Sequence, residues 1–102
     1  MTDHVERRRH GRHEKPTFLV TLEGHTYQAS NWSLGGLMLR GYDGSRAVGE
    51  AIRGEFGIAG ESERCPFEGL VVRVDHENQE IAIGFAGLSD EAFNILSSHA
   101  AT

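Results

Sequence analysis

The stretch TFLVTLEGHTYQASNW, residues 17–32, places two strand-forming segments on either side of Glu23-Gly24. Segments 17–22 and 25–32 are rich in β-branched and aromatic residues, which favour strands. A two-residue connection that ends in glycine supplies the φ > 0 that a tight hairpin turn needs. The stretch therefore predicts a β-hairpin, and the rest of the fold is built outward from it.

Four more strands are predicted after the hairpin. They cover residues 37–40, 52–58, 64–74 and 81–86. The GYDGSRAVG segment, residues 41–49, contains too many turn formers for regular structure and predicts a loop. Ile52, Phe56 and Ile58 alternate with polar residues, as in a half-buried strand. Pro66 indicates a sheet edge or a strand start, and Gly69 a β-bulge.

A C-terminal helix is predicted over about residues 89–99. Ser89 is a suitable N-cap, and acidic residues follow it at the positive end of the helix dipole. Apolar residues then recur at helical spacing, so the helix should close one face or one mouth of the sheet. Six antiparallel strands would most economically close into a small barrel, because an open sheet leaves edges exposed. The predicted class is all-β: a six-stranded antiparallel barrel with this helix and a flexible N-terminal arm.

Length and charge bound the possible functions. The 102 residues form one domain, divided into an arm over residues 1–15 and a barrel over residues 16–102. The arm has five cations against three carboxylates, a charge of +2, whereas the remainder has five against twelve, a charge of −7. An acidic body disfavours binding to DNA, RNA or membrane surfaces through a broad basic face, and makes a nucleic-acid-binding barrel with a basic tail the weaker alternative.

No apolar stretch is long enough for a membrane span or secretion signal, so we expect a cytoplasmic protein without membrane insertion. Cys65 is the only cysteine and predicts a buried, inert thiol.

Two short motifs contain residues that could bind a ligand. RRRHGR, residues 7–12, concentrates four guanidinium groups, and NWSLGG, residues 31–36, places polar side chains and two glycines where a strand should turn. A guanidinium grips a phosphate, or the N7 and O6 acceptors of guanine, with two parallel hydrogen bonds. Asn31 and Ser33 lie two apart on a strand and should project from one face. Gly36 would let the backbone approach a ligand closely or adopt a conformation barred to other residues.

Together these motifs resemble the paired signature of the PilZ domain, RxxxR followed by [D/N]xSxxG. Arg8 and Arg12 match the first motif, and Arg7 supplies an extra leading arginine. The second motif is matched by Asn31, Ser33 and Gly36. The resemblance continues through VVRV (71–74), IAIGF (81–85) and the closing helix, and so covers nearly the whole chain.

This resemblance implies a six-stranded barrel that binds the bacterial second messenger cyclic di-GMP. The implied ligand residues are Arg7, Arg8, Arg12, Asn31, Ser33 and Gly36. The arm would order around the nucleotide and signal to an unidentified effector protein, with either one cyclic di-GMP or a stacked pair as ligand. The alternative is a PilZ-fold interaction adaptor that does not bind the nucleotide. We expect neither an enzyme nor a cofactor, because no spaced cluster of carboxylates and histidines, P-loop or nucleophile motif is present.

Two residue types have second interpretations. His4, His10 and His13 invite a metal site, but an arm beside several arginines is a poor frame for a dication, and no metal is predicted. Trp32 could stack on a base, although packing in the core or at the barrel rim is the favoured interpretation.

Overall fold

The structure, a computed structural model, describes residues 13–100 of the chain. The elements in this range are β1 (Phe18–Leu22), β2 (His25–Ser33), β3 (Gly36–Arg40), β4 (Ala51–Ile58), β5 (Cys65–Asp75), β6 (Glu80–Leu88) and α2 (Asp90–Ala100). Arg7, Arg8, Arg12, His4 and His10 lie outside the described residues, as does most of the predicted flexible arm.

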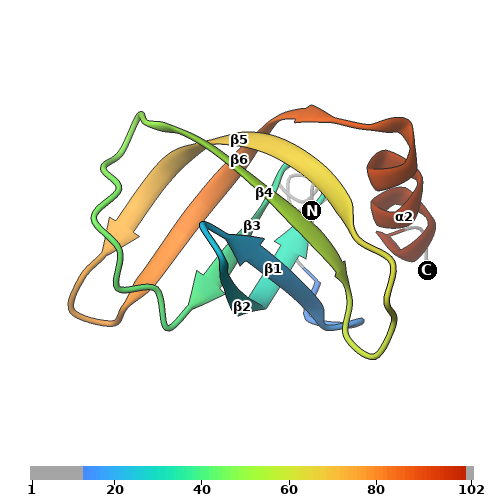
Figure 1. Ribbon diagram of the computed structural model, residues 1–102, viewed down its shortest axis with the longest axis horizontal. Helices are drawn as coiled ribbons and strands as arrows, with labels where there is room; N and C mark the ends of the chain where they lie inside the picture. Colours follow the sequence, from blue (N-terminus) through green and yellow to red (C-terminus); the bar gives the residue numbers. More distant parts are fainter. Residues whose placement is uncertain (1–12, 101–102) are drawn as a thin grey trace, which may run out of the picture.

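The six strands form one closed antiparallel barrel in the order β1-β2-β3-β6-β5-β4, with β4 pairing back to β1 (Figure 1). The predicted fold class is therefore confirmed.

In the first hairpin, Leu22 pairs with His25. Glu23 and Gly24 have φ of 54° and 85°, so both turn residues occupy the left-handed region that matches the twist of a two-residue hairpin.

The barrel interior is filled by one apolar cluster. Its largest fully buried side chains are Trp32, Phe18, Phe56, Leu22, Leu37, Leu39, Ile81, Ile83 and Leu96. Phe18 contacts Trp32 edge-on at a ring-centroid distance of 4.9 Å and Phe56 at 5.5 Å. These rings lie at the end of the barrel where the N-terminal segment meets the first strand. Cys65 is also buried there, as the sequence predicted.

β5 is the longest strand and bends twice. Its register against β6 shifts between Glu68 and Gly69, which confirms the predicted bulge, and again between Val71 and Arg73. Pro66 is the second residue of the strand and pairs with Glu55. Because the barrel is closed, Pro66 marks a strand start and not a sheet edge.

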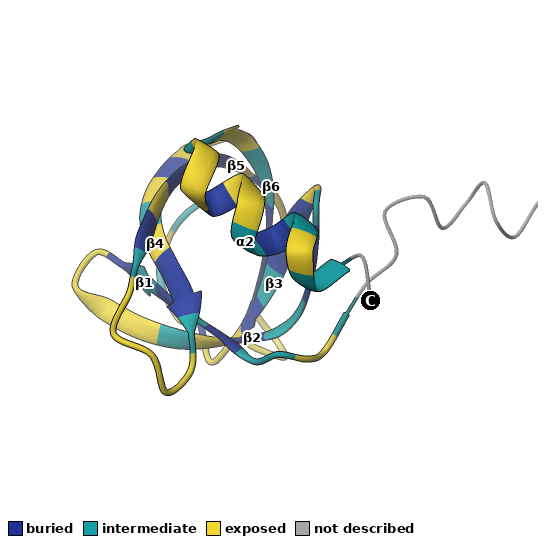
Figure 2. Ribbon diagram, turned by 90° about the vertical axis from the view of Figure 1, so that its right-hand side faces the viewer, coloured by how far each residue is buried: buried dark blue, intermediate teal, exposed yellow. Residues whose placement is uncertain are grey.

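α2 lies across one end of the barrel (Figure 2). The Ser89 hydroxyl accepts a hydrogen bond from the Ala92 amide at 3.1 Å, which confirms Ser89 as the N-cap. Ala92 and Leu96 are fully buried on the face that meets the barrel. Since i and i+4 share one face of a helix, this pair fixes which side of α2 points inward. None of the described helices has the length and apolar content needed to cross a membrane.

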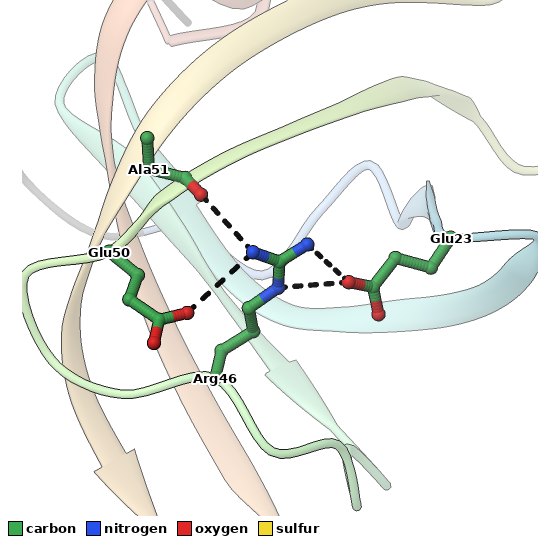
Figure 3. A network of polar contacts seen from close by, with 4 residues as sticks. All are labelled: Glu23, Arg46, Glu50 and Ala51. Atoms are coloured by element: carbon green, nitrogen blue, oxygen red, sulfur yellow. Dashed lines mark hydrogen bonds and ion pairs between the residues drawn. The ribbon is translucent and has the colours of Figure 1, made fainter.

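The loop between β3 and β4 is irregular, as predicted, but it is fastened to the first hairpin. Arg46 forms an ion pair with Glu23 of the β1–β2 turn, and its Nε donates to the same carboxylate at 2.8 Å (Figure 3). Nη1 also lies 3.6 Å from Glu50 and 3.5 Å from the Ala51 carbonyl oxygen. The hydrogen bond to Glu23 raises the pKa of the Arg46 guanidinium. One arginine thus connects two loops at the barrel end away from α2.

Candidate ligand site at the β2–β3 turn

The second sequence motif forms the hairpin between β2 and β3. Ser33 pairs with Gly36, so Leu34 and Gly35 make a two-residue turn. Ser33 is only 2% exposed, and its hydroxyl accepts a hydrogen bond from the Gly35 amide at 3.1 Å. The hydroxyl therefore orders the turn from within, whereas the sequence analysis named Ser33 as a ligand residue.

Gly36 is required by packing and not by its own dihedral angles. The positive-φ glycines of the described chain are Gly24, Gly41, Gly49 and Gly60, so the expectation of an unusual conformation at Gly36 is wrong. A Cβ at Gly36 would lie 2.1 Å from the Ile83 carbonyl oxygen of β6. The neighbouring Gly35 carbonyl accepts a hydrogen bond from the Phe85 amide at 2.9 Å. Glycine thus allows the turn to pack directly on the β6 backbone.

Asn31 lies at the start of the same turn region. It is partly exposed and pairs with Met38, just after a register shift in β2 that follows Ala29. Asn31 and Ser33 flank Trp32 on the strand. The structure therefore brings the three motif residues Asn31, Ser33 and Gly36 into one short segment.

Trp32 joins this turn to the N-terminal segment through three contacts. It forms an antiparallel bridge with His13, in which the two amides donate to the two carbonyls at 2.8 and 2.9 Å. The His13 ring lies 4.7 Å from the Trp32 ring, and the indole Nε1 donates to the Pro16 carbonyl at 3.0 Å. Trp32 is 0% exposed, which confirms the core interpretation.

The bridge has a direct consequence for the first motif. His13 is the residue that follows Arg12 in the chain, and it is hydrogen-bonded to the residue between Asn31 and Ser33. The first described residue after the arginine motif is thus connected to the second motif, some twenty positions further along the chain. Sequence reasoning had placed His13 in the arm and did not foresee this bridge.

One further cation belongs to the same face of the barrel. Asn31, Met38, Ala82 and Arg73 are successive cross-strand partners on β2, β3, β6 and β5. The Arg73 guanidinium lies across this row, with Nη2 at 3.7 Å from the Met38 sulfur. Arg73 was not among the sequence-predicted site residues. Its position depends on the shift after Val71, and the only sequence signal was a charged residue among the valines of a strand.

The described residues provide no obvious metal centre. Among residues 13–100, no group of three or more His, Cys, Asp or Glu side chains is placed to hold a metal ion. His13, the described one of the three arm histidines, lies against the Trp32 ring in a tilted arrangement. A hollow of about 590 Å³ is present, but it lies over β4, β5 and the end of β6 and shares no lining residue with the motif.

Solved structures resemble this barrel closely. One is the Bacillus subtilis inhibitor of motility, MotI/DgrA, with a TM-score of 0.70 and 18% identity over 92% of this chain and 49% of that chain. Another is the PilZ domain of YcgR from Escherichia coli, solved with c-di-GMP, with a TM-score of 0.63 and 18% identity over 92% of this chain and 88% of that one. No family model and no curated protein matches the sequence.

These likenesses show that the chain has the PilZ-domain fold, as the two motifs indicated. The chain spans about half the length of MotI/DgrA.

Proposed function

We propose that this protein is a non-enzymatic receptor for cyclic di-GMP, held between the arginines of residues 7–12 and the β2–β3 turn. The ligand residues would be Arg7, Arg8, Arg12, Asn31, Ser33 and Gly36. The observation that supports the proposal is the His13–Trp32 bridge, because it holds His13, the residue that directly follows the arginine motif, beside Asn31 and Ser33. The YcgR PilZ domain, which shares the fold, was solved with the same nucleotide.

The chemistry of the two sides is complementary to this ligand. Cyclic di-GMP has two phosphates and two guanines, and each guanine edge offers N7 and O6 acceptors to a planar guanidinium. Several arginines on one short segment can share these acceptors between a base and a phosphate. On the barrel side, the partly exposed Asn31 amide supplies both a donor and an acceptor.

Arg73 extends the proposed site onto the barrel. Its guanidinium lies over Met38, next to Asn31 in the cross-strand row. A planar cation supported on a thioether is well placed to stack on a purine face or to pair with a phosphate. The backbone of Arg73 is held on β5, so its place on the barrel is set before the ligand binds.

The output would be conformational. Ordering residues 7–12 around the nucleotide would change the surface beside the barrel and so create or remove a binding site for an effector protein. The non-binding adaptor is the competing function. It shares the fold but makes no use of the arginine motif.

Calorimetric titration with cyclic di-GMP tests the proposal. Arg8→Ala and Arg12→Ala should each weaken binding by roughly 10- to 100-fold, the loss of one charged, forked interaction. Arg73→Ala should weaken it by roughly 3- to 10-fold. Arg64→Ala is the matched control, because the Arg64 guanidinium donates to carbonyls of its own turn, at Glu61 and Glu63.

Cyclic di-AMP serves as the ligand control. Adenine presents an amino donor where guanine presents the O6 acceptor, so the arginine fork loses one partner. Equal affinity for both dinucleotides would contradict guanine recognition. Absence of binding by the wild-type chain would favour the adaptor.

A further inference from the structure

A second feature of the barrel surface lies away from the β2–β3 turn. The hollow of about 590 Å³ runs over β4, β5 and β6, which lie side by side (Figure 1). Its apolar lining comes from Pro66, Phe67 and Leu88. Gly87, at its margin, has no side chain to fill it, and a Cβ there would still lie 3.8 Å from the nearest Glu68 oxygen.

Carboxylates dominate the margin of this groove. Glu55 and Glu68 line it, and Asp90 and Glu91 follow directly after the lining residue Ser89. Arg53 is the cation among the lining residues, and its Nε lies 3.3 Å from Glu68. Two lining carboxylates against one cation give the groove a net negative charge. It therefore favours a basic occupant with some apolar contact.

The arginine motif of the same chain meets this requirement and lies within reach. From His13, the cross-strand partners Trp32, Leu37 and Ile83 lead to β6, about 15 Å across three strand spacings. Gly87 is four residues further along β6, about 13 Å. Six extended residues before His13 span about 20 Å, and arginine side chains add to that length.

We propose that, in the absence of nucleotide, residues 7–12 dock in the groove between β4, β5 and β6. Their guanidinium groups pair with Glu55 and Glu68, and the aliphatic parts of the arginine side chains cover Pro66 and Leu88. The arm then has two alternative binding sites, the groove and the β2–β3 turn. The docking itself does not depend on nucleotide binding, whereas its regulatory consequence rests on the proposed function. A nucleotide would have to displace the arm, which lowers its apparent affinity.

Amide NMR spectra of the full chain without nucleotide test the docking. The variant R7A/R8A/R9A/R12A should shift the amides of Gly54, Glu55, Glu68 and Gly87 relative to the wild type. Amides of the distant β5–β6 turn, residues 76–79, should not move. The shifts should be independent of protein concentration and should shrink with added salt, because exposed ion pairs are screened. Unchanged groove amides would overturn the proposal, as would shifts that grow with concentration, since these would place another copy's arm in the groove.

Calorimetry on a groove variant tests the consequence. E55Q/E68Q should bind cyclic di-GMP about two- to tenfold more tightly than the wild type, because two surface ion pairs no longer compete. E77Q, in the β5–β6 turn, is the matched control and should leave the affinity unchanged. If the wild type binds no nucleotide while the groove amides still depend on the arginines, the receptor function fails and the docking stands. If the groove amides do not depend on the arginines but the nucleotide binds normally, the docking fails and the receptor function stands.

Discussion

At the scale of single residues, the β2–β3 turn depends on the absence of a side chain at Gly36. The space that a Cβ would occupy is taken by the Ile83 carbonyl oxygen, 2.1 Å away. A motif glycine that sequence reasoning assigned to ligand approach is therefore also a packing requirement. Loss of binding in a Gly36 variant would thus combine two effects, a lost approach to the ligand and a disturbed packing of the turn on β6.

We expect Gly36→Ala to lower the free energy of unfolding by roughly 2–3 kcal/mol, since backbone atoms on β3 and β6 must separate. Gly35→Ala is the matched control, because its Cβ would meet only the Ser33 hydroxyl, at an ordinary 3.7 Å. Urea unfolding of both variants checks the prediction. Equal stability of the two would contradict it.

A substitution at Tyr42 should stabilise the protein, in contrast to the change at Gly36. The residue is 3% exposed, and among the described residues its buried hydroxyl has no hydrogen-bond partner. Because an unpaired buried hydroxyl is destabilising, Tyr42→Phe should raise the free energy of unfolding by about 1 kcal/mol. Tyr27→Phe, on the neighbouring and partly exposed ring, serves as control in the same denaturation experiment. A destabilised Tyr42→Phe would show that the hydroxyl is paired in solution.

At the scale of elements, the helix that closes the barrel begins at a single capping side chain. Ser89→Ala removes the acceptor for the Ala92 amide and should lower the free energy of unfolding by about 1 kcal/mol. Ser98→Ala is the control, since this exposed hydroxyl donates to the Ile95 carbonyl within the helix. Thermal unfolding followed by circular dichroism distinguishes the two. If both variants melt alike, the Ser89 cap contributes nothing to stability.

Elements with local signals were predictable from the sequence. The Glu23-Gly24 turn, the Gly69 bulge and the Ser89 cap each follow from the residues at that position, and the structure has all three. The candidate site was predictable only in part. The sequence pattern places Asn31, Ser33 and Gly36 around one turn, as the structure does. It did not predict the His13–Trp32 bridge or the place of Arg73, because both depend on pairing between distant segments. Strand register between such segments is set by the whole barrel, and no local pattern encodes it.

At the scale of the whole molecule, Cys65 reports on the integrity of the barrel. Burial, and secondarily the charges of Glu63 and Glu91, raise the pKa of this thiol. The folded protein therefore holds the proton more tightly than the unfolded chain. The resulting stabilisation is present below about pH 9 and is lost as the pH rises through the folded-state pKa.

Two measurements check this expectation. The free energy of unfolding should fall more steeply above pH 9 in the wild type than in Cys65→Val, which has no thiol to ionise. At pH 8, an aromatic disulfide reagent should label Cys65 only as fast as the barrel opens, so labelling should accelerate in proportion to the unfolded fraction when urea is added. Rapid labelling of the native protein would contradict the buried position.

The His13–Trp32 bridge also determines how the barrel would respond to a mechanical load. Two backbone hydrogen bonds, a ring contact and the indole hydrogen bond to Pro16 fasten residues 13–16 to the fully buried Trp32. A tether pulling on the amino terminus would therefore load this fastening first, before the closed ladder of strands bears any force. Tension applied through residues 13–16 would reach Asn31 and Ser33 through Trp32, and the β2–β3 turn would be the first part of the barrel to yield.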